Sequence, residues 1–132
     1  MKTIKERIEE ERADIVPLYI CDIFSHICIG TVTEDMEPSA FSRFLNLKPS
    51  GEVNILDNVR ASYMISSIKC CLSARYQKKW EEEMIKLCKI NSYKNHHNDA
   101  EKSEKNKDFV RDIKEAVANI ETIKKNYLRF FT

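Results

Sequence analysis

The scarcity of glycine and proline is the feature that most restricts what this chain can fold into. Only two glycines and three prolines occur among 132 residues. Hairpins and β-sandwiches need turn residues every ~8–12 positions, whereas helices are interrupted by them. Apolar residues instead recur at three- and four-residue spacings, which is the repeat of an amphipathic helix. We therefore predict an all-α protein, a compact bundle of roughly five or six helices.

Length and composition fit one soluble domain. The 132 residues suffice for a single core, and 42% apolar residues are too many for a disordered chain. Twenty-two basic and twenty-one acidic residues give a net charge of +1, so no net field draws the protein to nucleic acid or to an anionic membrane. The N-terminus lacks a signal peptide, and no stretch approaches the ~18 apolar residues of a spanning helix. We expect a cytoplasmic protein without membrane insertion.

The apolar pattern divides the chain into three parts. Residues 1–90 carry the helical patterns of a bundle, which begins at Thr3, where Glu6 completes a capping box. Residues 91–106 hold almost no apolar side chain and are predicted to form an exposed polar linker. Residues 107–132 carry the most regular apolar stripe and predict an amphipathic C-terminal helix. Because such a stripe must be covered, we expect this helix to fold back on its own bundle, with a helix-exchanged dimer as the alternative.

Boundaries and core positions within the bundle follow from the same spacing. Later helices are expected from Pro17 to Cys28, around Phe41 and Phe44, from Val53 to Ala74, and from Trp80 to Cys88. The side chains expected in the core are Leu18, Phe24, Phe44, Val59, Ile68, Trp80 and Leu87. The odd number of cysteines, all within apolar helical patterns, predicts reduced core thiols: Cys21, Cys28, Cys70, Cys71 and Cys88.

Residue patterns typical of catalysis or metal binding do not occur along the chain. Gly30 and Gly51 are too few for a glycine-rich phosphate loop, and the cysteines lack the spacing of a zinc site. His96 and His97 lie in the polar segment, where solvated side chains are expected, and His26 is expected at the edge of the core. We therefore predict no catalytic residues, no metal and no cofactor.

Charged residues suggest how the protein binds others. Runs such as Glu9-Glu10-Glu11 are ordinarily solvated faces. Acidic side chains nevertheless crowd the first three expected helices, and basic ones follow from the third to the fifth. This asymmetry suits head-to-tail assembly better than RNA binding. The expected interaction residues are Glu9, Glu10 and Asp35 on the acidic side and Arg43, Arg60 and Lys79 on the basic side.

The order of features in the first part of the chain resembles a known family. An apolar segment at residues 13–24, interrupted by Pro17, precedes Thr31-Val32-Thr33-Glu34-Asp35-Met36, a glycine turn, a long apolar helix and another that opens at Lys79-Trp80. This order resembles a caspase-recruitment domain (CARD), nearest to the N-terminal copies in the cytosolic RNA-sensing helicases. The resemblance implies a six-helix death-fold bundle, here with an additional long C-terminal helix. It also implies no catalysis, and signalling in innate antiviral immunity through assembly with another such domain or with itself, without direct nucleic-acid binding.

Two other functions compete with this interpretation. The first is a virus-encoded Bcl-like bundle that offers a groove to an amphipathic partner helix. A surface groove lined by Phe41, Phe44 and Tyr63 favours that function, whereas burial of these side chains favours the death fold. The second is a plain helical assembly subunit that pairs through the C-terminal helix.

Overall fold

The computed structural model describes residues 14–131, except for the side chains of His97 and residues 127–131. Within this range no β-strand occurs, so the all-α prediction is confirmed. The helix expected from Thr3 lies outside the described residues. The described helices are α2 (Leu18–Cys28), α3 (Pro38–Leu45), α4 (Asn58–Cys71), α5 (Ala74–Leu87), α6 (Tyr93–Lys102) and α7 (Lys107–Phe131), with a 3-10 turn η1 (Glu104–Asn106) between the last two.

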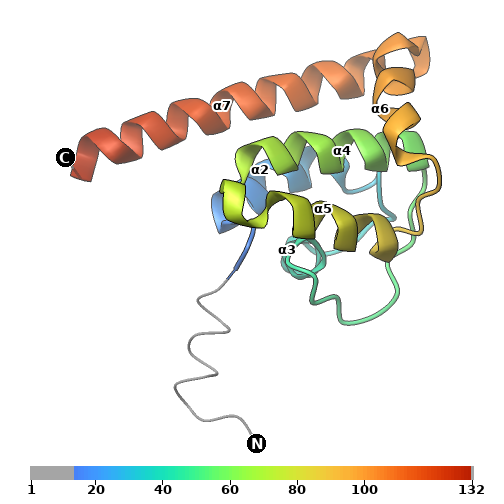
Figure 1. Ribbon diagram of the computed structural model, residues 1–132, viewed down its shortest axis with the longest axis horizontal. Coiled ribbons are helices and arrows are strands. Elements are labelled where there is room, and N and C mark those ends of the chain that lie inside the picture. The colour runs from blue at the N-terminus through green and yellow to red at the C-terminus, as the bar shows by residue number, and fades with distance from the viewer. Residues whose placement is uncertain (1–13, 132) are drawn as a thin grey trace, which may run out of the picture.

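Helix α4 lies at the centre of the arrangement (Figure 1). Helices α5, α6 and α7 all pack against it, while α2 packs against α3 and α7. The helix is shorter than the segment expected from Val53 to Ala74 because Asp57 caps it. The Asp57 carboxylate accepts hydrogen bonds from the backbone N–H groups of Val59 and Arg60, at 2.9 and 3.1 Å, and so satisfies donors that have no partner within the helix.

Trp80 is a core residue, and it lies in the middle of α5 rather than at its start. Its side chain is fully buried, and its indole Nε1–H donates a hydrogen bond of 2.8 Å to the Leu45 carbonyl at the end of α3. Phe24, Phe44 and Ile68, also expected in the core, are fully buried in the same cluster. The two remaining side chains of this part of the expected core, Val59 and Leu87, are partly buried and pack against it.

Leu18, also expected in the core, is 74% exposed. Ile20 and Phe24 set the buried face of α2. Leu18 therefore shares the opposite face with Asp22 and His26, which follow it at four-residue spacings on the helix surface. The His26 side chain, expected at the edge of the core, is exposed for the same reason.

The segment predicted as a polar linker, residues 91–106, is helical and belongs to the folded body. Helix α6 packs closely against α4, where the small side chain of Ala100 is fully buried. Polar contacts hold it: the Tyr93 hydroxyl donates to Glu81 at 2.7 Å, and the Tyr63 hydroxyl to Glu101 at 3.3 Å. The segment carries almost no apolar periodicity that would indicate a helix, and the prediction of an exposed linker was wrong.

The buried side chains among the described residues of helix α7 lie between Phe109 and Ile120. Phe109, Ile113 and Ile120 are buried, and the helix contacts α4 and α2. From residue 121 to 126 every side chain is exposed, and the helix continues past the ends of its neighbours (Figure 1). The expected packing of this helix on its own bundle is therefore observed for residues 109–120. None of the described helices is long and apolar enough to cross a bilayer.

Candidate functional site

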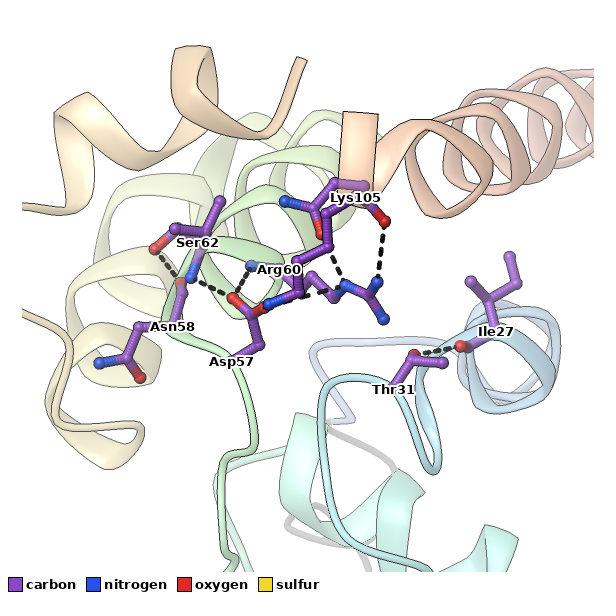
Figure 2. Close-up of polar contacts among 9 residues, drawn as sticks. Ile27, Thr31, Asp57, Asn58, Arg60, Ser62 and Lys105 are labelled. Carbon is purple, nitrogen blue, oxygen red and sulfur yellow. Dashed lines mark hydrogen bonds and ion pairs between the residues drawn. The ribbon is translucent and has the colours of Figure 1, made fainter. Parts of the chain in front are cut away.

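A network of polar side chains joins α4 to the start of α7 (Figure 2). Arg60 Nε donates to Asn106 Oδ1 at 2.7 Å, and Arg60 Nη2 donates to the Lys105 carbonyl at 3.2 Å. The same guanidinium lies 5.4 Å from the centre of the Phe109 ring. Lys105 Nζ donates to the Asp57 carboxylate at 3.1 Å. Arg60 was expected at an interaction surface, but its side chain is only 20% exposed and it holds helices together instead.

This network lowers the pKa of the Asp57 carboxyl group. Burial alone raises its pKa, but hydrogen bonds from the Arg60 backbone and from Lys105, with the positive charge of Lys105, outweigh that effect. The net result is a pKa below the ordinary value for aspartate. The charged form is therefore the one that the folded protein stabilises.

Glu81 is the centre of a second network, which joins α4, α5 and α6. Its Oε1 accepts from Lys69 Nζ at 3.0 Å, and its Oε2 accepts from the Tyr93 hydroxyl at 2.7 Å. Burial and this hydrogen bond raise the pKa of Tyr93. Both networks thus use their ionised groups to attach helices to one another.

The histidine and cysteine side chains in the described part of the chain do not belong to a metal-binding group. The His96 side chain, expected to be solvated, is only 21% exposed, and its Nδ1 lies 3.8 Å from the Asp99 carboxylate without a hydrogen bond. All five cysteines are free; four are buried as expected, while Cys70 is exposed. Burial raises the pKa of Cys88 to about 12. Among the described residues, no three His, Cys, Asp or Glu side chains are grouped so that they could hold a metal ion.

Acidic side chains gather beside the N-terminal end of α4. Glu34, Asp35 and Glu37, here called the acidic end, are exposed. Their loop is held there by backbone hydrogen bonds from Glu34 N–H to the Asn54 carbonyl at 3.1 Å and from residue 56 to residue 32 at 2.8 Å. A hollow of about 90 Å³ lies among Glu34, Asp35, Met36 and residues 52–54. Asp35 was expected in this role, whereas Glu9 and Glu10 lie outside the described residues.

Basic side chains gather beside the other end of α4. Helix α5 begins shortly after α4 ends, and its first turns carry Arg75, Lys78 and Lys79, here called the basic end. All three are exposed, and Lys78 and Lys79 have no ion pair with any described residue. The two ends are separated by α4, whose 14 residues span roughly 21 Å at ~1.5 Å per residue. Arg43, another expected interaction residue, is exposed on α3.

Each charged end also exposes one large apolar side chain. Leu56 is 53% exposed close to the acidic end, and Tyr76 is 36% exposed within the basic end. By contrast, Phe41, Phe44 and Tyr63 are buried, so these side chains do not line the surface groove expected for a Bcl-like bundle. The exposure of Leu56 and Tyr76 has no local sequence signal, because it depends on which neighbours the fold supplies.

Comparisons with known proteins identify no relative. No family model matches the chain, and no curated protein or solved structure matches it. The arrangement of the acidic and basic ends, with their exposed apolar side chains, is therefore the basis for assigning a function.

Proposed function

We propose that this protein is a non-catalytic assembly module, which binds a second copy of itself or another domain of the same kind head to tail. The separation of opposite charges along α4 supports this proposal. The acidic end of one copy is complementary to the basic end of the next, and the apolar Leu56 of one faces Tyr76 of the other. Such a contact joins two different surfaces, so it can be repeated along a chain of copies.

The strength of this contact depends on several charges acting together. An exposed ion pair contributes only about 0.2–1 kcal/mol, so a single pair cannot hold two copies together. Three acidic and three basic side chains, with burial of the two apolar ones, provide a cooperative contact whose rate of formation falls with added salt. Arg60 takes no part in it because it is bound to Asn106. Arg75 and Lys78 take its place beside Lys79.

The resemblance to a caspase-recruitment domain implies the same mode of action. Under that resemblance the module belongs to a cytoplasmic antiviral sensor or adaptor, and its partner is a second domain of that family. The charge separation supports assembly in either case, because it does not depend on the identity of the parent protein.

Analytical ultracentrifugation of charge-reversed variants tests the proposal. We expect wild-type protein to form oligomers that shrink when salt is raised from about 50 to 300 mM, since screening shortens the reach of surface charges. The variant Arg75→Glu/Lys78→Glu/Lys79→Glu and the variant Glu34→Lys/Asp35→Lys/Glu37→Lys should each be monomeric. Their equimolar mixture should assemble again, because every end then meets its complement.

A matched control separates this contact from a general effect of charge. Lys94, Lys102 and Lys107 are exposed on α6 and at the start of α7, with no ion pair to a described residue. Reversing these three to glutamate changes the net charge as much as reversing the basic end, but should leave assembly intact. A wild-type protein that is monomeric at every concentration, or oligomers indifferent to salt and to both reversals, would refute head-to-tail assembly.

A further inference from the structure

The segment that precedes α4 is extended and is paired along one of its edges. From residue 52 to residue 57 exposed and partly buried side chains alternate, as they do in an extended chain. The Asn54 carbonyl accepts a hydrogen bond from the N–H of residue 34 at 3.1 Å, and the Leu56 N–H donates one to the carbonyl of residue 32 at 2.8 Å. These bonds form a short antiparallel bridge, so residues 32–34 occupy this edge of the segment.

The backbone groups of Val53 and Ile55 form the other edge, here called the free edge. Alternate residues of an extended chain direct their N–H and C=O groups to opposite edges, so these two residues direct theirs away from residues 32–34. Among the described residues, none forms a hydrogen bond with these N–H and C=O groups. Unpaired backbone groups in a row are a template for the backbone of another extended chain.

A hollow of about 300 Å³, here called the edge hollow, lies beside the free edge. It is lined by residues 52–55, by Asn58 in the first turn of α4, and by residues 87–89 at the end of α5. The Asn58 side chain points away from the Arg60 network (Figure 2), and no described residue is hydrogen-bonded to its amide. The volume lies at the lower end of the ~300–1,000 Å³ of ligand pockets. A chain that pairs with the free edge therefore finds space for its own side chains.

Negative charge prevails around the free edge. Glu34 and Asp35 line the smaller hollow together with residues 52–54, and neither has an ion pair with a described residue. Glu52 pairs with Lys89 at 3.1 Å, so Lys89 neutralises Glu52 and leaves the other two charges unopposed. Two copies joined through their free edges would bring these acidic side chains together, which disfavours a second copy as the occupant. A positively charged chain is the complementary partner.

We infer that the free edge is a docking site for an extended, basic segment of another protein, which adds to it as a β-strand. Hydrogen bonds to the backbone of Val53 and Ile55 attach the segment, and alternate side chains enter the edge hollow. The remaining side chains lie on the exposed face where the Asn54 amide donates to Glu34, so lysine or arginine meets the acidic charge there.

Such a segment competes with a second copy of the protein. Glu34 and Asp35 belong to the acidic end and also provide the charge beside the free edge. This part of the inference rests on the proposed head-to-tail assembly, in which the same side chains meet the basic end of the next copy. A bound segment therefore occupies the acidic end and shortens the oligomers.

Fluorescence polarisation with synthetic peptides tests the docking site on the full-length protein. The probe is a labelled seven-residue peptide in which lysine alternates with valine, and its control carries glutamate in place of every lysine. We expect the basic peptide to bind at least tenfold more tightly than the acidic one at about 150 mM salt, where distant charges are screened. The variant Arg75→Glu/Lys78→Glu/Lys79→Glu should also bind the basic peptide, because it keeps the free edge.

Methylated peptides separate strand addition from plain attraction between charges. N-methylation of the valines alone, or of the lysines alone, removes the N–H donors along one edge of the extended peptide. Only the edge that meets the protein matters, so one methylated peptide should lose at least tenfold in affinity and the other should bind like the parent. Loss on methylation of the valines indicates antiparallel addition, and loss on methylation of the lysines indicates parallel addition.

Substitutions of exposed residues show whether the site is where the inference places it. Asn58→Lys puts a positive charge into the edge hollow and should weaken binding of the basic peptide at least fivefold. Lys89→Glu removes the lysine that neutralises Glu52 and should strengthen binding several-fold. Lys78→Glu makes the same change of charge nine residues before Leu87 on α5, roughly 13 Å away, and should alter the affinity less than twofold. Circular dichroism should show that all three variants are folded.

Several results would overturn the inference. Equal binding of the basic and acidic peptides would indicate general adhesion, and equal effects of the two methylations would exclude strand addition. Indifference to both Asn58→Lys and Lys89→Glu would place the site elsewhere. A dimer that Asn58→Lys converts to a monomer would identify a second copy as the occupant, and peptide binding that requires deletion of residues 1–13 would identify the chain itself.

Analytical ultracentrifugation with and without the basic peptide tests the competition. We expect saturating peptide to shorten wild-type oligomers, whereas the acidic peptide should not. Oligomers that bind the basic peptide without shortening would refute the competition alone. A wild-type protein that binds the peptide but is monomeric at every concentration would refute head-to-tail assembly and leave the docking site standing, so the two proposals fail separately.

Discussion

Replacement of Trp80 should be the most damaging single substitution in the described part of the chain. The side chain is fully buried, and its N–H satisfies the Leu45 carbonyl. The Leu45 carbonyl has no backbone donor four residues on, where a helix would supply one, because that residue is Pro49, which has no N–H. Trp80→Phe keeps an aromatic ring but leaves the buried carbonyl unpaired, at about 1–3 kcal/mol, in addition to the lost ring volume. Trp80→Ala removes the whole ring and should cost about 3–5 kcal/mol.

These costs are large beside the ~5–15 kcal/mol that stabilises an ordinary domain. At this chain length each kcal/mol lowers Tm by roughly 3–6 °C. Urea and thermal unfolding followed by circular dichroism is the suitable assay, because Trp80 is the only tryptophan and its fluorescence disappears with it. Lys78→Ala, on the exposed face of the same helix, should stay within about 0.5 kcal/mol of wild type. A Trp80→Ala protein that melts within a few degrees of wild type would refute the reasoning.

Three further predictions concern other parts of the molecule. With a thiol reagent such as DTNB, one cysteine, Cys70, should react rapidly in the native protein and the four buried thiols only on unfolding, so several fast thiols would contradict the packing. Asp57 stabilises the fold above its unfolded pKa of about 3.9, and this contribution is lost as pH falls through its lower folded pKa. Asp57→Asn can still cap α4 but carries no charge, so its free energy of unfolding, measured with urea, should fall less than that of wild type as the pH is lowered. An equal fall in both proteins would contradict the role of the Asp57 charge. Deletion of residues 107–132 uncovers α2 and α4, at about 25 cal/mol per Å² of apolar surface, and should cause aggregation or a marked loss of stability. A truncated protein as soluble and stable as the full chain would contradict this.

Local patterns were sufficient to predict some elements of the fold. The all-α class follows from the scarcity of turn residues, and the apolar stripe of α7 follows from a three- and four-residue spacing that needs no knowledge of its neighbours. Burial of Trp80 and Phe24 follows in the same way, since large apolar side chains on a periodic face have few other places to go. Charge asymmetry in the sequence also anticipated exposed Asp35, Arg43 and Lys79.

Tertiary structure decided what depends on contacts between distant residues. The Arg60 side chain became a structural link because Asn106, 46 positions away, lies within hydrogen-bonding distance. Most of residues 91–106 became helical, as α6 and η1, because α4 and α5 supply packing surface and hydrogen-bond partners, although the apolar pattern of this segment is nearly blank. Leu18 was left exposed because the neighbours of α2 cover its other face. A sequence states which side chains need partners, but only the folded chain determines which partners are near enough to satisfy them.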